Sequence, residues 1–128
     1  MATRSKAKAL ARNESKDRRP KAIAKYIRIS PSKVQVVLDL IRGRDYKEAV
    51  AILKTTAKAA AEPVLKCMNS AAANAEVNLG MNKDTLYVAE CFADQGPTLK
   101  RMQPVSRGRG YRILKRTSHI TVILDERA

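Results

Sequence analysis

Residues 95–124, QGPTLKRMQPVSRGRGYRILKRTSHITVIL, decide the fold expected for this chain. The stretch contains no acidic residue and seven basic ones: Lys100, Arg101, Arg107, Arg109, Arg112, Lys115 and Arg116. Two extended runs flank the sequence Gly108-Arg109-Gly110, so the pattern predicts a long β-hairpin that bends at these glycines. Because the run has no acidic partners of its own, its charge fits a polyanion.

The charge of the whole chain is concentrated near its two ends. The 128 residues include 26 Lys and Arg against 12 Asp and Glu, which gives a net charge of +14. Residues 1–28 hold ten basic and two acidic side chains, residues 29–94 hold eight of each, and residues 95–118 hold seven basic ones alone. A neutral body with two basic extensions is typical of proteins that bind nucleic acid.

Other features of the composition restrict the compartment and the chemistry. The longest apolar runs, such as residues 120–124, are far shorter than the about 20 residues that span a bilayer. The N-terminus lacks the apolar core of a secretory signal, and Glu14 and Asp17 argue against a transit peptide. Cys67 and Cys91 lack metal-ligand spacing and lie in apolar surroundings, which predicts buried, reduced thiols. We therefore expect a cytoplasmic protein that uses no membrane, metal or other cofactor.

Local patterns predict a single α+β domain over residues 22–128, preceded by a flexible basic tail over residues 1–21. The tail is polar and has no apolar period, so it cannot offset the entropy lost on ordering. Residues 22–29 alternate as a short strand, and strand-like patterns return from Leu86 onward. The expected fold has three helices packed on a small antiparallel three-stranded sheet. The hairpin, over about residues 95–120, is too long to rest on so small a body and should project from it.

The helices are expected between these strands. The first begins at Ser30-Pro31, where serine can cap free amides and proline at the first helical position costs no hydrogen bond. The second begins with a capping box from Asp45 to Glu48. The third runs over about residues 59–79, with Pro63 in its first turn and Gly80 as its stop. The side chains expected in the core are Val34, Val37, Leu38, Ile41, Ala49, Val50, Ile52, Leu53, Val64, Leu65, Met68, Ala72, Ala75 and Leu79.

The sequence offers no set of catalytic residues, so we expect a binding protein. His119 is the only histidine and has no acidic neighbour in sequence, and the carboxylates are scattered at helix starts or beside basic residues. Gly108-Arg109-Gly110 lacks the third glycine and the following helix of a nucleotide-binding loop. Both glycines can supply positive φ and a close approach to phosphate, and the arginines can form two-pronged hydrogen bonds with it. Tyr111 can stack on an unpaired base or pack on the turn.

Four segments of the sequence resemble the bacterial-type family of large-subunit ribosomal protein twenty-two. Residues 96–101 and 112–122, on either side of the bend, carry the more specific match. Residues 27–33 and 69–74 resemble the start of the family's first helix and its long helix. The resemblance covers about residues 22–126. It implies an α+β body that binds large-subunit ribosomal RNA and a hairpin whose tip lines the peptide exit tunnel near its constriction.

From the charge pattern and this resemblance together, we expect the protein to bind large-subunit ribosomal RNA through its basic tail and its hairpin. The residues expected to contact ribosomal RNA are Arg18, Arg19, Lys21, Lys25, Arg28, Lys33, Lys100, Arg101, Arg107, Arg109, Arg112, Lys115, Arg116 and His119. The expected tunnel-lining tip consists of Val105, Ser106, Arg107, Gly108, Arg109, Gly110 and Tyr111. The sequence departs from the family pattern at Val105, where a basic residue is expected, and in a tail longer than the family core. The expected partners are ribosomal RNA, neighbouring large-subunit proteins and the nascent peptide, without a homo-oligomer.

Two other functions are considered from the sequence. A DNA-bending architectural protein with basic β-arms also binds backbone and shape without catalysis. Such proteins need a dimer core, whereas the balanced charge and the lack of a surplus apolar face here favour a monomer. An RNA-modifying enzyme would need the catalytic set that the sequence lacks. Co-sedimentation with large ribosomal subunits in high salt would discriminate best among these functions.

Overall fold

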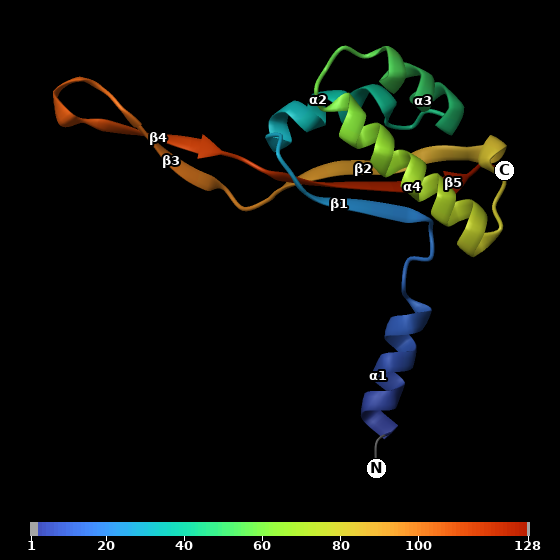
Figure 1. Cartoon of the computed structure of the whole chain (residues 1–128). Helices are drawn as coiled ribbons and strands as arrows, with labels where there is room; N and C mark the ends of the chain where they lie inside the picture. The colour runs from blue at the N-terminus through green and yellow to red at the C-terminus, as the bar shows by residue number, and fades with distance from the viewer. Residues whose placement is uncertain (1–2, 128) are drawn as a thin grey trace.

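The computed structural model describes residues 3–127 and shows an α+β body from which two segments project (Figure 1). The body contains β1 (Lys21–Ile27), α2 (Pro31–Ile41), α3 (Tyr46–Thr55), α4 (Ala61–Leu79), the 3-10 helix η1 (Lys83–Thr85), β2 (Leu86–Gln95) and β5 (Ser118–Glu126). The projecting segments are helix α1 (Thr3–Glu14) and a hairpin of β3 (Leu99–Pro104) and β4 (Gly110–Lys115), with the 3-10 turn η2 (Ser106–Gly108) at its tip. The expected α+β architecture is confirmed.

The body is a three-stranded antiparallel sheet whose helices lie on one face (Figure 1). Strand β5 is central in the order β1-β5-β2, so the first strand of the sheet pairs with the last strand of the chain. Ile120, Val122 and Leu124 alternate along β5 and are fully buried, as a strand with one covered face requires. Within residues 3–127, no helix is both long enough and apolar enough to cross a bilayer.

Helices α2 and α4 supply most of the helical side of the core. The four residues predicted on the buried face of α2, from Val34 to Ile41, are each at most 1% exposed. On α4, Val64, Met68, Ala72 and Ala75 are fully buried as expected. Leu79 is 46% exposed, so its predicted burial was wrong. It is the last residue of α4, and the chain turns away immediately afterward at Gly80, whose φ is +64°.

Helices α2 and α3 begin where the sequence predicts, but the predicted capping hydrogen bonds are not formed. Ser30 and Asp45 occupy the N-cap positions with extended backbone, yet neither side chain accepts a capping hydrogen bond. Asp45 Oδ1 instead lies 3.1 Å from Nε of Arg127, and Glu48 pairs with Arg44 at 2.6 Å. The predicted capping box is therefore wrong, because Arg127 engages the carboxylate of Asp45 and Arg44 engages that of Glu48.

The basic N-terminal segment contains a helix where we expected irregular chain. Helix α1 spans Thr3–Glu14 and buries no side chain. Its residues include Ala, Lys, Arg and Leu and exclude Gly and Pro, so high intrinsic helix propensity favours a helix here although no tertiary packing supports it. The missing apolar period argues only against helices that pack on a core, so it does not exclude α1. The flexibility of this segment stays a prediction.

The hairpin leaves the body through a narrow junction. The amide of Gly96 donates to the carbonyl oxygen of Thr117 at 2.9 Å, and the Thr117 hydroxyl donates to the Pro97 carbonyl at 2.6 Å. A Cβ atom on Gly96 would lie 2.5 Å from Oγ1 of Thr117. Beyond this junction the ladder resumes as β3 and β4, which form a separate two-stranded sheet. Two hydrogen bonds and a close contact at Gly96 therefore hold the two chain segments together where the hairpin leaves the body.

Candidate nucleic-acid interface

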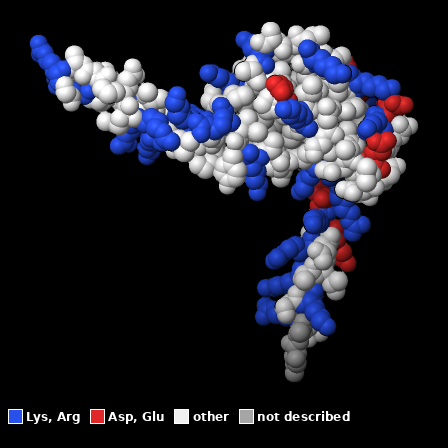
Figure 2. All heavy atoms as spheres, viewed as in Figure 1, with Lys and Arg blue, Asp and Glu red and all other residues white. Residues whose placement is uncertain are grey.

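The hairpin carries cations on both of its faces. Residues directly opposite each other in an antiparallel pair share a face, so the register places Arg101 and Lys115 on one face and Lys100 and Arg112 on the other. All four side chains are exposed. Figure 2 shows Lys and Arg side chains along the projecting hairpin and no Asp or Glu among them on the visible face. Charge on both faces fits a hairpin that a polyanion surrounds, rather than one that rests on the protein surface.

Large apolar side chains are also exposed between these cations. Met102 is 68% exposed, Tyr111 66% and Leu114 44%. Met102 and Leu114 share a face with Lys100, and Tyr111 lies on the other face. RNA offers phosphates to the cations and the flat surfaces of unstacked bases to the apolar groups. The sequence pattern pointed to Tyr111 but not to Met102 and Leu114, because the exposure of these two side chains follows only from the projection of the hairpin.

The tip is a loop over residues 105–109. The amide of Val105 donates to the carbonyl of Arg109 at 2.9 Å, which closes the loop. Positive φ is found at Arg107 and Gly108, at +62° and +68°, and not at Gly110. Gly110 lies opposite Pro104 in the ladder, and a Cβ atom there would lie 2.7 Å from Cε of Met102. Both glycines were expected to supply positive φ, and this is wrong for Gly110. Gly108 has the positive φ of the turn, whereas Gly110 leaves space for the side chain of Met102.

A cationic hollow lies where the hairpin base meets the start of α2. Ile27 of β1 is opposite Ser118 of β5, which brings the turn between β1 and α2 beside the hairpin. The hollow has a volume of about 400 Å³ and is lined by Arg28, Ile29, Ser30, Lys33, Ala59, Leu114, Lys115 and Arg116. Its four cations form no ion pair with any residue in the range 3–127. Unpaired cations that converge on a concave surface fit a phosphate backbone.

The predicted contacts near β1 differ in their availability. Arg18, Lys21 and Lys25 are exposed. Arg19 instead donates to both carboxylate oxygens of Asp17 and, at 2.8 Å, to Glu90 of β2. The hydrogen bonds from Arg19 lower the pKa of Asp17 to about 2, and the two carboxylates raise the pKa of Arg19. Arg19 therefore fastens the N-terminal segment to the sheet, and its guanidinium is occupied within the protein.

His119 also has a partner inside the protein. Its Nδ1 accepts a hydrogen bond from the backbone amide of Tyr26 at 3.0 Å, and the two rings meet edge to face with centroids 5.0 Å apart. Tyr26 has a φ of +59°, a conformation that costs energy for a residue with a side chain. His119 thus stabilises the irregular end of β1, and its Nδ1 is not free to contact RNA in this conformation.

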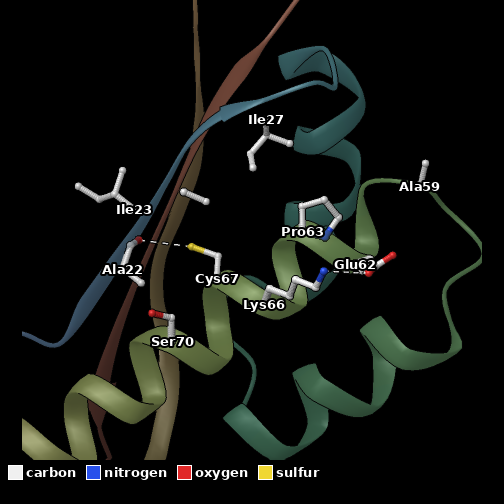
Figure 3. A pocket seen from close by; sticks show the side chains of 10 residues that line it. Ala22, Ile23, Ile27, Ala59, Glu62, Pro63, Lys66, Cys67 and Ser70 are labelled. Atoms are coloured by element: carbon white, nitrogen blue, oxygen red, sulfur yellow. Dashed lines mark hydrogen bonds and ion pairs between the residues drawn. The ribbon is translucent and has the colours of Figure 1, made fainter.

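A second depression runs between β1 and the first half of α4 (Figure 3). It has a volume of about 570 Å³ and a largely apolar lining that includes Ile23, Ile27 and Pro63. Three of its polar side chains are engaged: Lys66 pairs with Glu62 at 3.0 Å, and the Cys67 thiol donates to the Ala22 carbonyl at 3.5 Å. Burial raises the pKa of Cys67, which disfavours the reactive thiolate. The predicted burial of Cys67 and Cys91 is confirmed.

Comparison with known proteins assigns the chain to a family. The model of the family described as ribosomal protein L22p/L17e matches residues 22–125. The large ribosomal subunit protein uL22 of Clostridium novyi is 58% identical over 108 residues, which cover 84% of this chain and 97% of that protein. Its namesakes from Clostridium beijerinckii and Acetivibrio thermocellus are each 59% identical over 84% of this chain, and 97% and 86% of their own lengths are covered. The chain belongs to the ribosomal protein L22p/L17e family.

Proposed function

We propose that this protein is a structural component of the large ribosomal subunit that binds ribosomal RNA through its hairpin and the cationic hollow. Its relatives carry the name of a large-subunit protein, which supports this assignment and a place in the cytoplasmic ribosome. Ribosomal RNA and neighbouring ribosomal proteins are then its partners. In this role the protein is a monomer without catalytic activity, and its function is to hold segments of ribosomal RNA together.

The observation that carries the proposal is the convergence of four cations from two distant parts of the sequence. Arg28 and Lys33 flank the start of α2, whereas Lys115 and Arg116 follow β4, and all four line one hollow. An ordinary soluble surface mixes charges of both signs, but no acidic side chain lines this hollow. RNA held there would continue directly onto the two charged faces of the hairpin.

The tip of the hairpin is proposed to line the peptide exit tunnel. Arg107 and Arg109 are exposed on either side of Gly108, where guanidinium groups can clamp phosphates or stack on bases of the tunnel wall. Gly108 keeps the bend narrow enough for a nascent peptide to pass. A Cβ atom at Gly108 would meet no atom within 4 Å, so a β-branched residue there would cost energy through the positive φ rather than through crowding within the protein.

The salt dependence of binding tests the proposed function. For folded RNA with single-stranded segments, the logarithm of the affinity falls with the logarithm of salt by about 0.7 per phosphate neutralised. We expect the full chain to show a slope that corresponds to at least about three contacts, and to sediment with large subunits after a high-salt wash. A shallower slope would contradict the proposal. Tighter binding to duplex DNA than to ribosomal RNA would favour an architectural DNA-binding protein instead.

A charge reversal at the tip tests the tunnel assignment separately. The variant Arg107→Glu/Arg109→Glu should stay in the subunit, because the hollow and the hairpin stem are unchanged, while repulsion moves its tip away from RNA. Chemical footprinting should show loss of protection of tunnel RNA. Lys54→Glu, on the exposed side of α3, controls for charge reversal away from the hairpin. Unchanged tunnel protection in the double variant would refute the clamp.

A further inference from the structure

We infer that α1 is a second RNA-binding element, which lies along the phosphate backbone of an RNA duplex. This inference rests on the proposed function but concerns a part of the chain outside the family match, which begins at Ala22. Helix α1 leaves the body near the start of β1 and points away from both the sheet and the hairpin (Figure 1). An RNA segment bound there would be distinct from the segment at the hairpin.

Three cations of α1 form a stripe along one side of the helix. Arg4, Lys8 and Arg12 are spaced four residues apart, which places them on one side of the helix with a rise of about 6 Å between neighbours. Lys6 lies on the opposite side. None of the three stripe cations pairs with an acidic residue within the described part of the chain. The stripe therefore presents three available charges in a line.

This arrangement disfavours α1 as a solitary helix. Like charges four residues apart repel each other, and cations near the positive N-terminal end of a helix, with Glu14 near its negative end, oppose the helix dipole. The first turn contains no acidic residue, and the helix buries no side chain that could compensate. Isolated helices of this length are marginal in water. A polyanion along the stripe would remove the repulsion and stabilise the helix.

The chemistry of the segment selects duplex RNA among polyanions. No aromatic residue precedes Tyr26, so residues 3–25 lack the aromatic rings on which binders of single-stranded RNA stack successive bases. The helix is rich in alanine, and Leu10 is its single large apolar side chain, which is too little for insertion into a membrane surface. Duplex RNA requires only phosphate contacts and shape, and the stripe with small neighbouring residues supplies both.

The test measures binding of the full chain to a blunt RNA duplex by fluorescence anisotropy over a range of salt. The stripe variant Arg4→Ala/Lys8→Ala/Arg12→Ala should reduce the salt slope by about 2 to 3, since each phosphate contact contributes about 0.7 to 0.9. Lys8→Ala should weaken binding about two- to fivefold more than its matched control Lys6→Ala, as expected for one exposed ion pair. Equal effects of Lys8→Ala and Lys6→Ala would overturn the stripe.

A variant that preserves charge tests whether the helix itself matters. Ala9→Pro breaks α1 but removes no cation, so it should weaken duplex binding while thermal unfolding of the body is unchanged, because α1 buries no side chain. Unchanged binding by Ala9→Pro, equal binding of single-stranded RNA, or a stripe effect seen only with vesicles of anionic lipid would each overturn the inference. If only Lys100→Ala/Arg101→Ala in the hairpin weakened RNA binding, the inference would fail and the proposed function would stand. If no variant mattered, both would fail.

Discussion

Replacing Gly96 by alanine tests whether the junction between sheet and hairpin is as tight as the structure shows. The new Cβ would lie 2.5 Å from Oγ1 of Thr117 and 3.3 Å from its backbone carbonyl carbon. Contacts below 3.0 Å are essentially absent between real atoms of this kind, so Thr117 or the chain at residue 96 must move. Gly96 does not have a positive φ, so the backbone conformation itself does not disfavour alanine.

The expected cost follows from what Thr117 loses. Its hydroxyl donates to the Pro97 carbonyl at 2.6 Å, and the residue is 5% exposed. Breaking this bond and leaving a buried hydroxyl without a partner costs about 1–3 kcal/mol. For a domain of this size, each kcal/mol lowers the melting temperature by about 4–8 °C. Gly96→Ala should therefore produce a clear fall in thermal stability, measured by circular dichroism.

A double-mutant cycle identifies the cause. Thr117→Ala removes both the clashing oxygen and the hydrogen bond, so Gly96→Ala should cost at least about 1 kcal/mol less in the Thr117→Ala background. Gly110→Ala is the matched control, because its Cβ would meet only the mobile end of Met102, in the exposed hairpin, and its cost should stay within about 0.5 kcal/mol. Costs of Gly96→Ala and Thr117→Ala that add within about 0.5 kcal/mol would refute the steric account.

Three further predictions concern the tip, the N-terminal ion pair and the core. Deleting residues 105–111 should leave the body folded, because no buried residue lies there; loss of helical circular dichroism in the isolated protein would contradict the projecting hairpin. In an NMR titration Asp17 should have a pKa of about 2, so its contribution to stability is present above about pH 4 and is lost as the pH falls toward 2. Arg19→Ala should return the pKa of Asp17 toward its ordinary value of 3.8, and an unchanged pKa would exclude the ion pair. Met68→Ala, at a fully buried site, should lower the free energy of unfolding by about 2–5 kcal/mol, whereas Val77→Ala on the exposed side of the same helix should change it by less than about 0.5 kcal/mol. Similar midpoints of urea unfolding for the two variants would contradict the packing of α4.

Mutations at the hairpin base and at its tip should have separable effects. Gly96 and Thr117 determine how the hairpin leaves the body, whereas Arg107 and Arg109 lie at the far end of a separate two-stranded sheet. A change at the base is expected to alter stability and the direction of the whole hairpin. A change at the tip is expected to alter only local RNA contacts, since the tip contributes no buried side chain.

Local sequence determined those features that depend on short-range physics. Proline after Ser30 fixed the start of α2, and the spacing of Val34 to Ile41 fixed its buried face, because both depend on helix geometry alone. The cation-rich residues 95–124 likewise determined a charged hairpin with its turn near Gly108. Apolar periodicity did not predict α1, because this helix buries no side chain and forms through helix propensity.

Tertiary structure alone decided which charged groups are available for a partner. Arg19 and Arg28 are both arginines in the basic N-terminal part of the sequence. Arg19 forms an ion pair with Glu90 of β2, whereas Arg28 lines the hollow together with Lys115. Both outcomes depend on the strand order β1-β5-β2, which pairs residues about a hundred positions apart. Local propensities carry no information on such pairing, because it is fixed by burial of Ile120, Val122 and Leu124 under α2 and α4. The sequence determined that the protein carries charge for a polyanion, and the packing of the core determined where that charge converges.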